Sequence, residues 1–244
     1  MSLLFKQCFK QRFRCQNCDR GFGIQRLKVP LCIRGNLRGI ASARMWVTQW
    51  NRAMTLSTLR MPATATLTAE QFYDLCRANP DWKLERTAQG DLVIMAPTGG
   101  ETGACNASLS ARVVIWNEQS QLGVVFDSST GFQLPNGANR SPDVAWVKRN
   151  RWDALTPQQR EKFPPLAPDF VIELMSPSDN LADVQAKMQE YRDNGVQLGW
   201  LLNRQAKQVE VYRPGQPPEV LQQPSQLRGD PLLPGFVLVV ESLW

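Results

Sequence analysis

The chain has 244 residues, of which 43% are hydrophobic and 20% charged, a composition typical of a folded globular protein. No stretch approaches about 18 consecutive apolar residues and no secretory signal pattern opens the sequence, so we expect a cytoplasmic protein. Histidine is absent, which excludes Ser-His-Asp and Cys-His hydrolases and imidazole-ligated metal sites. Any catalysis has to use carboxylates, Lys, Arg, Tyr, Ser or Cys.

Residues 1–60 form a basic N-terminal extension. They carry 12 Lys and Arg and one acid, Asp19, whereas the remaining residues carry 16 Lys and Arg against 21 Asp and Glu. The net charge of +6 therefore belongs to the extension, and it says little about whether the rest of the chain binds nucleic acid. The extension shows neither helical nor strand periodicity.

Four of the six cysteines lie in this extension, at Cys8, Cys15, Cys18 and Cys32. Cys15 and Cys18 have the spacing of a zinc knuckle, although a zinc ribbon usually has two such pairs. Three interpretations stay open. The extension is a disordered arm or upstream sequence from a misassigned start, with Met54 or Met61 as the initiator; it is a basic arm that binds nucleic acid; or it holds zinc on the four cysteines.

Residues 61–244 are expected to form one domain, because regular helix and strand patterns run from Thr68 onward. The expected elements, in chain order, are a helix at 68–78 with a capping box at 68–71, hairpin strands at 82–86 and 92–96, a helix at about 104–119, strands at 124–126, 132–134 and 143–147, a short helix at 156–162, a strand at 170–175, a helix capped by 176–179 and closed by Gly195, and strands at 198–202, 208–212 and 236–240. This order predicts an α/β domain with a mixed central β-sheet flanked by helices.

Two acids stand where the pattern calls for apolar residues. Asp143 begins an apolar strand after Ser141-Pro142, and Glu173 interrupts an otherwise apolar run. Ionised carboxylates in buried places are costly unless they are paired or bind a cation. Two of them on neighbouring strand ends, with adjacent backbone carbonyls, would form an oxygen-rich pocket suited to Mg²⁺.

Lys187 and Glu85 complete the candidate set. Lys187 lies on the helix that follows the Glu173 strand, on the side that Val184, Met188 and Tyr191 suggest faces the sheet. From there its ammonium could orient an attacking water or stabilise a phosphate in the transition state. Glu85, on the first hairpin strand, could complete a metal shell or act on the water.

Each of these residues also has a purely structural interpretation. Glu173 could be salt-bridged to Arg140, and Asp143 could accept hydrogen bonds in a turn. Lys187 could be a solvated helix lysine, and Glu85 could occupy an exposed hairpin position. The chain order of Asp143, Glu173 and Lys187 favours the functional interpretation of Lys187, whereas both interpretations of Glu85 stay open.

Several segments, in order, resemble the Uma2 family of restriction-endonuclease-like proteins. The resemblance covers about residues 64–244 and is carried by residues 67–72 (LTAEQF), 84–85 (LE), 96–100 (APTGG), 141–144 (SPDV), 168–179 (PDFVIELMSPSD), Lys187, Tyr191, 195–196 (GV) and 200–202 (WLL). It implies a PD-(D/E)xK core in which Asp143 and Glu173 match the two acids. The lysine normally placed two residues after the second acid is replaced by Met175, and Lys187 on the next helix matches it instead. Asn106 stands near the place where many members carry a histidine.

The resemblance implies a Mg²⁺- or Mn²⁺-dependent endonuclease that acts on DNA. Its catalytic residues are expected to be Glu85, Asp143, Glu173 and Lys187, and its metal ligands Asp143, Glu173 and Glu85. A homodimer is expected for double-strand cleavage. Two alternatives stay open: a non-catalytic nucleic-acid-binding or assembly module that keeps the fold, and a DNA-binding protein with a zinc arm.

Overall fold

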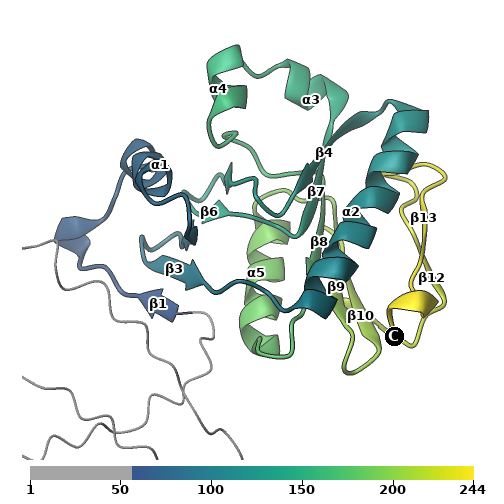
Figure 1. Cartoon of the computed structure of the whole chain (residues 1–244). Coiled ribbons are helices and arrows are strands. Elements are labelled where there is room, and N and C mark those ends of the chain that lie inside the picture. Colours follow the sequence, from purple (N-terminus) through teal and green to yellow (C-terminus); the bar gives the residue numbers. More distant parts are fainter. Residues whose placement is uncertain (1–56) are drawn as a thin grey trace, which may run out of the picture. The chain divides into compact units, whose positions relative to one another are not determined.

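The computed structural model describes residues 57–244, which Figure 1 colours along the sequence. The possible zinc site, the basic arm and the initiator at Met54 lie outside the described residues. The helices are α1 (Ala69–Ala78), α2 (Gly100–Ser120), α3 (Arg149–Asp153), α4 (Pro157–Glu161) and α5 (Leu181–Asp193), with 3-10 turns at Ala63–Ala65 and Glu241–Leu243. None of these helices is both long and apolar enough to cross a lipid bilayer.

The strands form three sheets. They are β1 (Ser57–Leu59), β2 (Lys83–Arg86), β3 (Leu92–Met95), β4 (Gly123–Asp127), β5 (Phe132–Gln133), β6 (Asn139–Arg140), β7 (Val144–Lys148), β8 (Phe170–Leu174), β9 (Leu198–Asn203), β10 (Gln208–Tyr212), β11 (Glu219–Gln222), β12 (Gln226–Arg228) and β13 (Val237–Val239). The strand orders are β11-β10-β9-β8-β7-β4, β1-β3-β2-β6-β5 and β12-β13. Strands β8 and β9 pair in parallel and the described neighbours otherwise pair antiparallel, so the predicted α/β class with a mixed sheet is confirmed.

The six-stranded sheet is covered by a long helix on each face, α2 on one and α5 on the other (Figure 1). Strand β8 lies in the middle of this sheet, and all five of its residues are buried. Side chains alternate along a strand. Ile172 therefore packs with the α2 side of the core and Val171 with Met188 and Tyr191 of α5. By the same alternation, Glu173 faces α5.

The parallel pairing of β8 and β9 explains where α5 lies. Parallel neighbours need a crossover connection, and α5 supplies it between the two strands. The helix begins after Asn180, whose side chain accepts a hydrogen bond from Ala182 N, and ends before Gly195 at φ +104°. Met188 and Tyr191 are fully buried against the sheet. The side of α5 predicted to face the sheet is thus the buried one.

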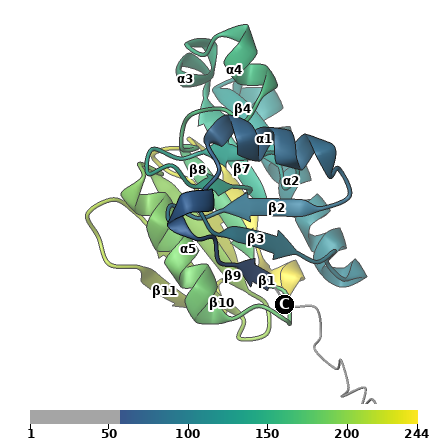
Figure 2. The same ribbon diagram turned by 90° about the vertical axis from the view of Figure 1, so that its left-hand side faces the viewer.

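The five-stranded sheet contains the predicted hairpin, β2 and β3, with α1 beside β2 (Figure 2). The predicted capping box of α1 is present, since the side chains of Thr68 and Gln71 each accept from the other's backbone amide. An additional strand, β1, pairs with β3 and lies before residue 61, where the domain was predicted to begin. The predicted boundary itself stays a prediction.

Several elements differ from the sequence-based expectations. Helix α2 begins at Gly100 rather than near residue 104, because Gly99 has the extended backbone of an N-cap and Glu101 stands in the first turn, where an acid is favourable. The N-cap of α5 is Asn180, whereas Asp179 accepts from Ser176 N within the preceding turn. Strands β6, β11 and β12 and helix α3 were not predicted, because elements of two to five residues carry too little periodicity.

Candidate active site

A cavity of about 1080 Å³ is lined by β2, β3, the loop before α2, the end of β8 and α5. All four predicted site residues line it: Glu85, Asp143, Glu173 and Lys187. The chain therefore brings together residues from β2, the start of β7, β8 and α5. The sequence predicted that these four residues lie at one site, and all four lie on the lining of the same cavity.

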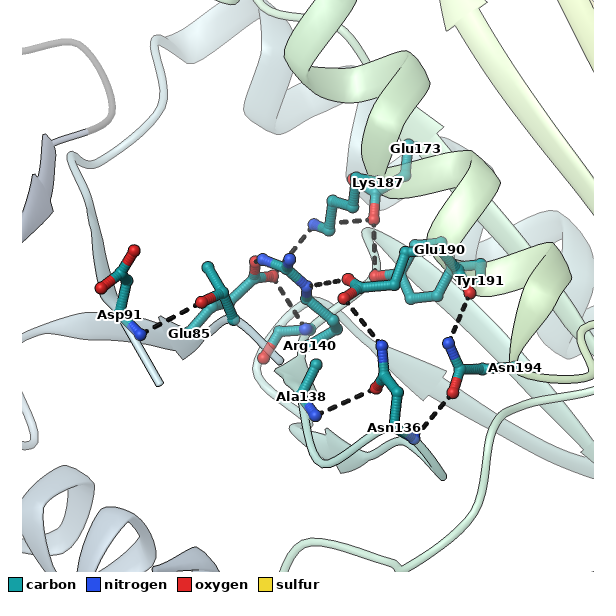
Figure 3. Close-up of polar contacts among 12 residues, drawn as sticks. Glu85, Asp91, Asn136, Ala138, Arg140, Glu173, Lys187, Glu190, Tyr191 and Asn194 are labelled. Carbon is teal, nitrogen blue, oxygen red and sulfur yellow. Dashed lines mark hydrogen bonds and ion pairs between the residues drawn. The ribbon is translucent and has the colours of Figure 1, made fainter. Parts of the chain in front are cut away.

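Glu173 and Lys187 form the centre of this site (Figure 3). The ammonium Nζ of Lys187 lies 2.8 Å from Glu173 Oε1, and the hydroxyl of Tyr191 donates to the same oxygen at 2.9 Å. Lys187 and Tyr191 are one helical turn apart on α5, so both reach the strand below. Only 15% of the Lys187 side chain is exposed, which rules out the interpretation as a solvated helix lysine.

Glu85 holds the other side of Lys187. Its Oε1 lies 2.9 Å from Lys187 Nζ and accepts a hydrogen bond from Ser141 N at 2.9 Å, while its Oε2 pairs with Arg140 at 3.1 Å. Arg140 also donates to Glu190 Oε2 at 2.5 Å. Glu85 is therefore buried and fully engaged, rather than on an exposed hairpin position, and Arg140 pairs with Glu85 and Glu190 instead of Glu173.

Asp143 lies directly before β7. The register of β7 and β8 pairs Val144 with Ile172, so one step further along places Asp143 across from Glu173. Its Oδ2 accepts from Leu174 N at 2.8 Å, and its Oδ1 accepts from Asn106 Nδ2 at 3.0 Å. Each carboxylate oxygen of Asp143 keeps a second lone pair.

The two glutamates have opposite pKa shifts. Burial by itself would raise the pKa of Glu85, but the charges of Lys187 and Arg140 outweigh it and lower the pKa to about 2. Burial raises the pKa of Glu173 to about 7, since the attraction of Lys187 is offset by the carboxylates of Asp143 and Glu85. Glu85 is thus firmly ionised, whereas the negative charge of Glu173 is only partly balanced by nearby positive charge.

Lys187 remains a cation. Burial acts to lower its pKa, but the carboxylates of Glu173 and Glu85 raise it above its ordinary value. The pKa of Tyr191 is raised by burial and then by Glu173, so its hydroxyl is a stable hydrogen-bond donor. Lys187 and Tyr191 both contact Glu173 Oε1, and Glu173 Oε2 accepts no hydrogen bond from residues 57–244.

Three residues of the site were not predicted to have a catalytic or metal-binding role. Arg140 precedes the Ser-Pro-Asp segment, Tyr191 follows Lys187 by four residues, and Asn106 lies near the start of α2. The spacing of Lys187 and Tyr191 was the available signal for Tyr191. Nothing in the sequence indicated that Arg140 would pair with both Glu85 and Glu190, because these residues come from separate elements.

The site has a limited set of candidate metal ligands. In residues 57–244, no group of three or more His, Cys, Asp and Glu side chains is placed to hold a metal ion together. Asp143 and Glu173 do face the same cavity, and Mg²⁺ is commonly held by one or two carboxylates with water completing its shell. The buried Oδ1 of Asn106, bonded through its own amide to Asp143, has no partner in this part of the chain. The donors present therefore fit a hard divalent cation.

Comparison with known proteins identifies the family. A family model described as "Putative restriction endonuclease" matches residues 69–241. The chain belongs to the Uma2 family. A crystal structure of a protein from Anabaena variabilis ATCC 29413, described as "a putative nuclease belonging to DUF820", is similar to this Uma2 chain with a TM-score of 0.60 at 21% identity. The match covers 72% of this chain and 97% of the other, and no curated protein matches.

The match confirms the resemblance drawn from sequence motifs. It runs from the start of α1 to the first residue of the last 3-10 turn, so the basic N-terminal extension lies outside it. At 21% identity, the likeness to the Anabaena protein shows a shared fold. In this Uma2 chain, Asp143 lies directly before β7 and across from Glu173 of β8.

Proposed function

We propose that the Uma2 domain is a Mg²⁺- or Mn²⁺-dependent endonuclease that hydrolyses DNA phosphodiester bonds. One observation carries the proposal: the buried Lys187 ammonium contacts both Glu173 and Glu85, at 2.8 and 2.9 Å, in a cavity that Asp143 also lines. Buried ionisable clusters with strongly shifted pKa values in a cavity are typical of functional sites.

The family description and the structural neighbour's description, both naming nucleases, support nuclease function. Charge supports the metal requirement, since eight acids and four bases line the cavity. A phosphodiester would be repelled from such a surface without a neutralising cation. When bound, the cation supplies Lewis acidity toward water and a phosphate oxygen.

The residues of the chain have distinct roles in this proposal. Asp143 and Glu173 offer oxygens to the cation, with Glu173 Oε1 held by Lys187 and Tyr191. Lys187 orients the attacking water or stabilises the negative charge on the phosphate during attack. Both carboxylate oxygens of Glu85 contact protein donors, namely Lys187, Arg140 and Ser141 N. Glu85 therefore positions Lys187, in addition to its predicted place among the metal ligands.

DNA cleavage tests the proposal directly. Purified protein is incubated with supercoiled and linear DNA in Mg²⁺, Mn²⁺ or EDTA, alongside Glu173→Gln. We expect wild-type cleavage with either metal, none in EDTA and none by the variant. Metal-independent cleavage, or equal cleavage by the variant, contradicts the proposal. A comparison of nicked with linear products also tests the proposed homodimer, because one site cuts one strand.

A non-catalytic module that keeps this fold is the second candidate. It would retain DNA binding in a mobility-shift assay and show no cleavage in any metal. The close contacts of Lys187 favour the enzyme, because a binding module has no need for an ammonium held between two buried carboxylates.

A further inference from the structure

Asn106 has one satisfied and one unsatisfied end. It lies on α2, lines the cavity, and donates from Nδ2 to Asp143 Oδ1 at 3.0 Å. Its carbonyl oxygen Oδ1 is buried and has no hydrogen-bond partner in residues 57–244. A buried carbonyl oxygen without a partner is energetically unfavourable. A hydrogen-bond donor or a cation bound in the cavity would satisfy it.

The orientation of the amide follows from charge. If the amide were turned over, its carbonyl oxygen would face the carboxylate of Asp143, and two acceptors would be opposed. The donor end is therefore fixed on Asp143, and the acceptor end is left beside it. The backbone of Asn106 is also fixed, because its helix neighbours Cys105 and Leu109 are buried in the core.

We propose that Asn106 Oδ1 is the third protein oxygen of the cation site, beside Asp143 and Glu173. This inference rests on the proposed metal-dependent function and deepens it. Amide carbonyls are ordinary ligands of hard cations. A neutral ligand also avoids placing a third carboxylate beside those of Asp143 and Glu173, which line the same cavity.

The same side chain links the ligand set together. With Nδ2 on Asp143 and Oδ1 on the cation, Asn106 holds the aspartate and the ion at a set separation, and Leu174 N holds the other oxygen of Asp143. Helix α2 thereby becomes part of the site, although none of its acids is needed for it.

Titration of the full chain with Mn²⁺ by calorimetry tests the assignment. Asn106→Leu, of similar size and with no polar atom, should weaken Mn²⁺ binding by about 10- to 100-fold. Glu101→Gln, on the same helix and the same cavity wall, removes a whole charge and should change binding by less than about threefold. Asn106→Asp keeps an oxygen at this position although it loses the donor to Asp143, so it should bind Mn²⁺ more tightly than Asn106→Leu.

The outcomes separate this inference from the proposed function. If wild type fails to bind Mn²⁺, both fall together. If wild type binds and Asn106→Leu binds equally well, only the assignment of Asn106 falls. The position of Mn²⁺ in soaked wild-type crystals tests the assignment of Asn106 even if the leucine variant does not fold. An anomalous peak about 2.2 Å from Asn106 Oδ1 supports direct ligation, and a peak beyond about 3.5 Å shows that Asn106 only orients Asp143.

Discussion

Lys187 of α5 and Glu85 of β2 form an ion pair of 2.9 Å that joins the helix packed on the six-stranded sheet to a strand of the five-stranded sheet. The same ammonium contacts Glu173 in the six-stranded sheet at 2.8 Å. Lys187 thus links the β2–β3 hairpin to strand β8 across the cavity. Because the pair is largely buried, its loss should affect both the stability of the fold and the geometry of the site.

The acid stability of the protein should depend on Glu85. Its pKa is about 2 in the folded chain and near 4.5 when exposed, so folding favours the ionised form. The resulting stabilisation, on the order of 3 kcal/mol, is fully present above pH 4.5 and is lost as the pH falls toward 2. Urea unfolding at pH 5 and pH 3 measures it.

Glu85→Gln supplies the comparison for this prediction. The variant should be less stable at pH 7, because Lys187 and Arg140 lose a charged partner, and its stability should fall less between pH 5 and pH 3. Glu219→Gln, at an exposed ion pair with Arg213, should keep the wild-type slope. Identical acid slopes for wild type and Glu85→Gln would show that Glu85 is not ionised as described.

Removing the charge of Glu173 should not destabilise the metal-free protein. The pKa of Glu173 is raised to about 7, so its stabilising contribution is present below about pH 4.5 and is lost as the pH rises through 7. In EDTA at pH 8, Glu173→Gln should therefore have an unchanged or higher thermal transition, while its DNA cleavage is abolished. An unfolded variant would instead make Glu173 a structural partner.

Tyr191→Phe should show whether the Tyr191 hydroxyl positions Glu173 for catalysis, with little effect on folding. The change deletes the hydroxyl that donates to Glu173 Oε1 and keeps the buried ring. We expect a loss of about 1 kcal/mol in stability, and a roughly tenfold drop in cleavage rate with Mn²⁺ affinity reduced as well. Tyr212→Phe, whose hydroxyl donates to Glu210 away from the cavity, is the matched control and should cleave normally. Equal rates for both variants would remove Tyr191 from the site.

Deletion of residues 1–53 should leave a folded domain with full activity. The shortened chain keeps β1 and the whole stretch matched by the Uma2 family. A second truncation that starts at Met61 removes β1 and exposes the edge of β3, so its thermal transition should be lower. Circular dichroism and cleavage assays of both proteins check this, and an unfolded first truncation would show that the extension contributes to the fold.

The acids of the site could be predicted because they violate a pattern. A charged residue inside the run at 170–175 has few explanations, and the structure shows Glu173 buried at the cavity. The α/β class followed in the same way from long periodic helices and apolar strands. These signals are local, so one sequence is enough to detect them.

Other features depend on contacts between distant segments. The burial of Glu85 requires β6 to pair beside β2, and β6 has only two residues. The pairing of Arg140 with both Glu85 and Glu190 depends on that arrangement and on the position of α5. The sequence therefore left open an exposed position for Glu85 and a pairing of Glu173 with Arg140, and the structure shows neither.

The most direct measurement is cleavage of supercoiled DNA in Mg²⁺ by wild type, Lys187→Met and Lys162→Met. Lys162 pairs with Glu70 and neither residue lines the cavity, so the Lys162→Met variant controls for the lost charge. The account predicts that wild type and Lys162→Met cut at similar rates, and that Lys187→Met folds, binds Mn²⁺ and does not cut. Cleavage by folded Lys187→Met at the wild-type rate would contradict it.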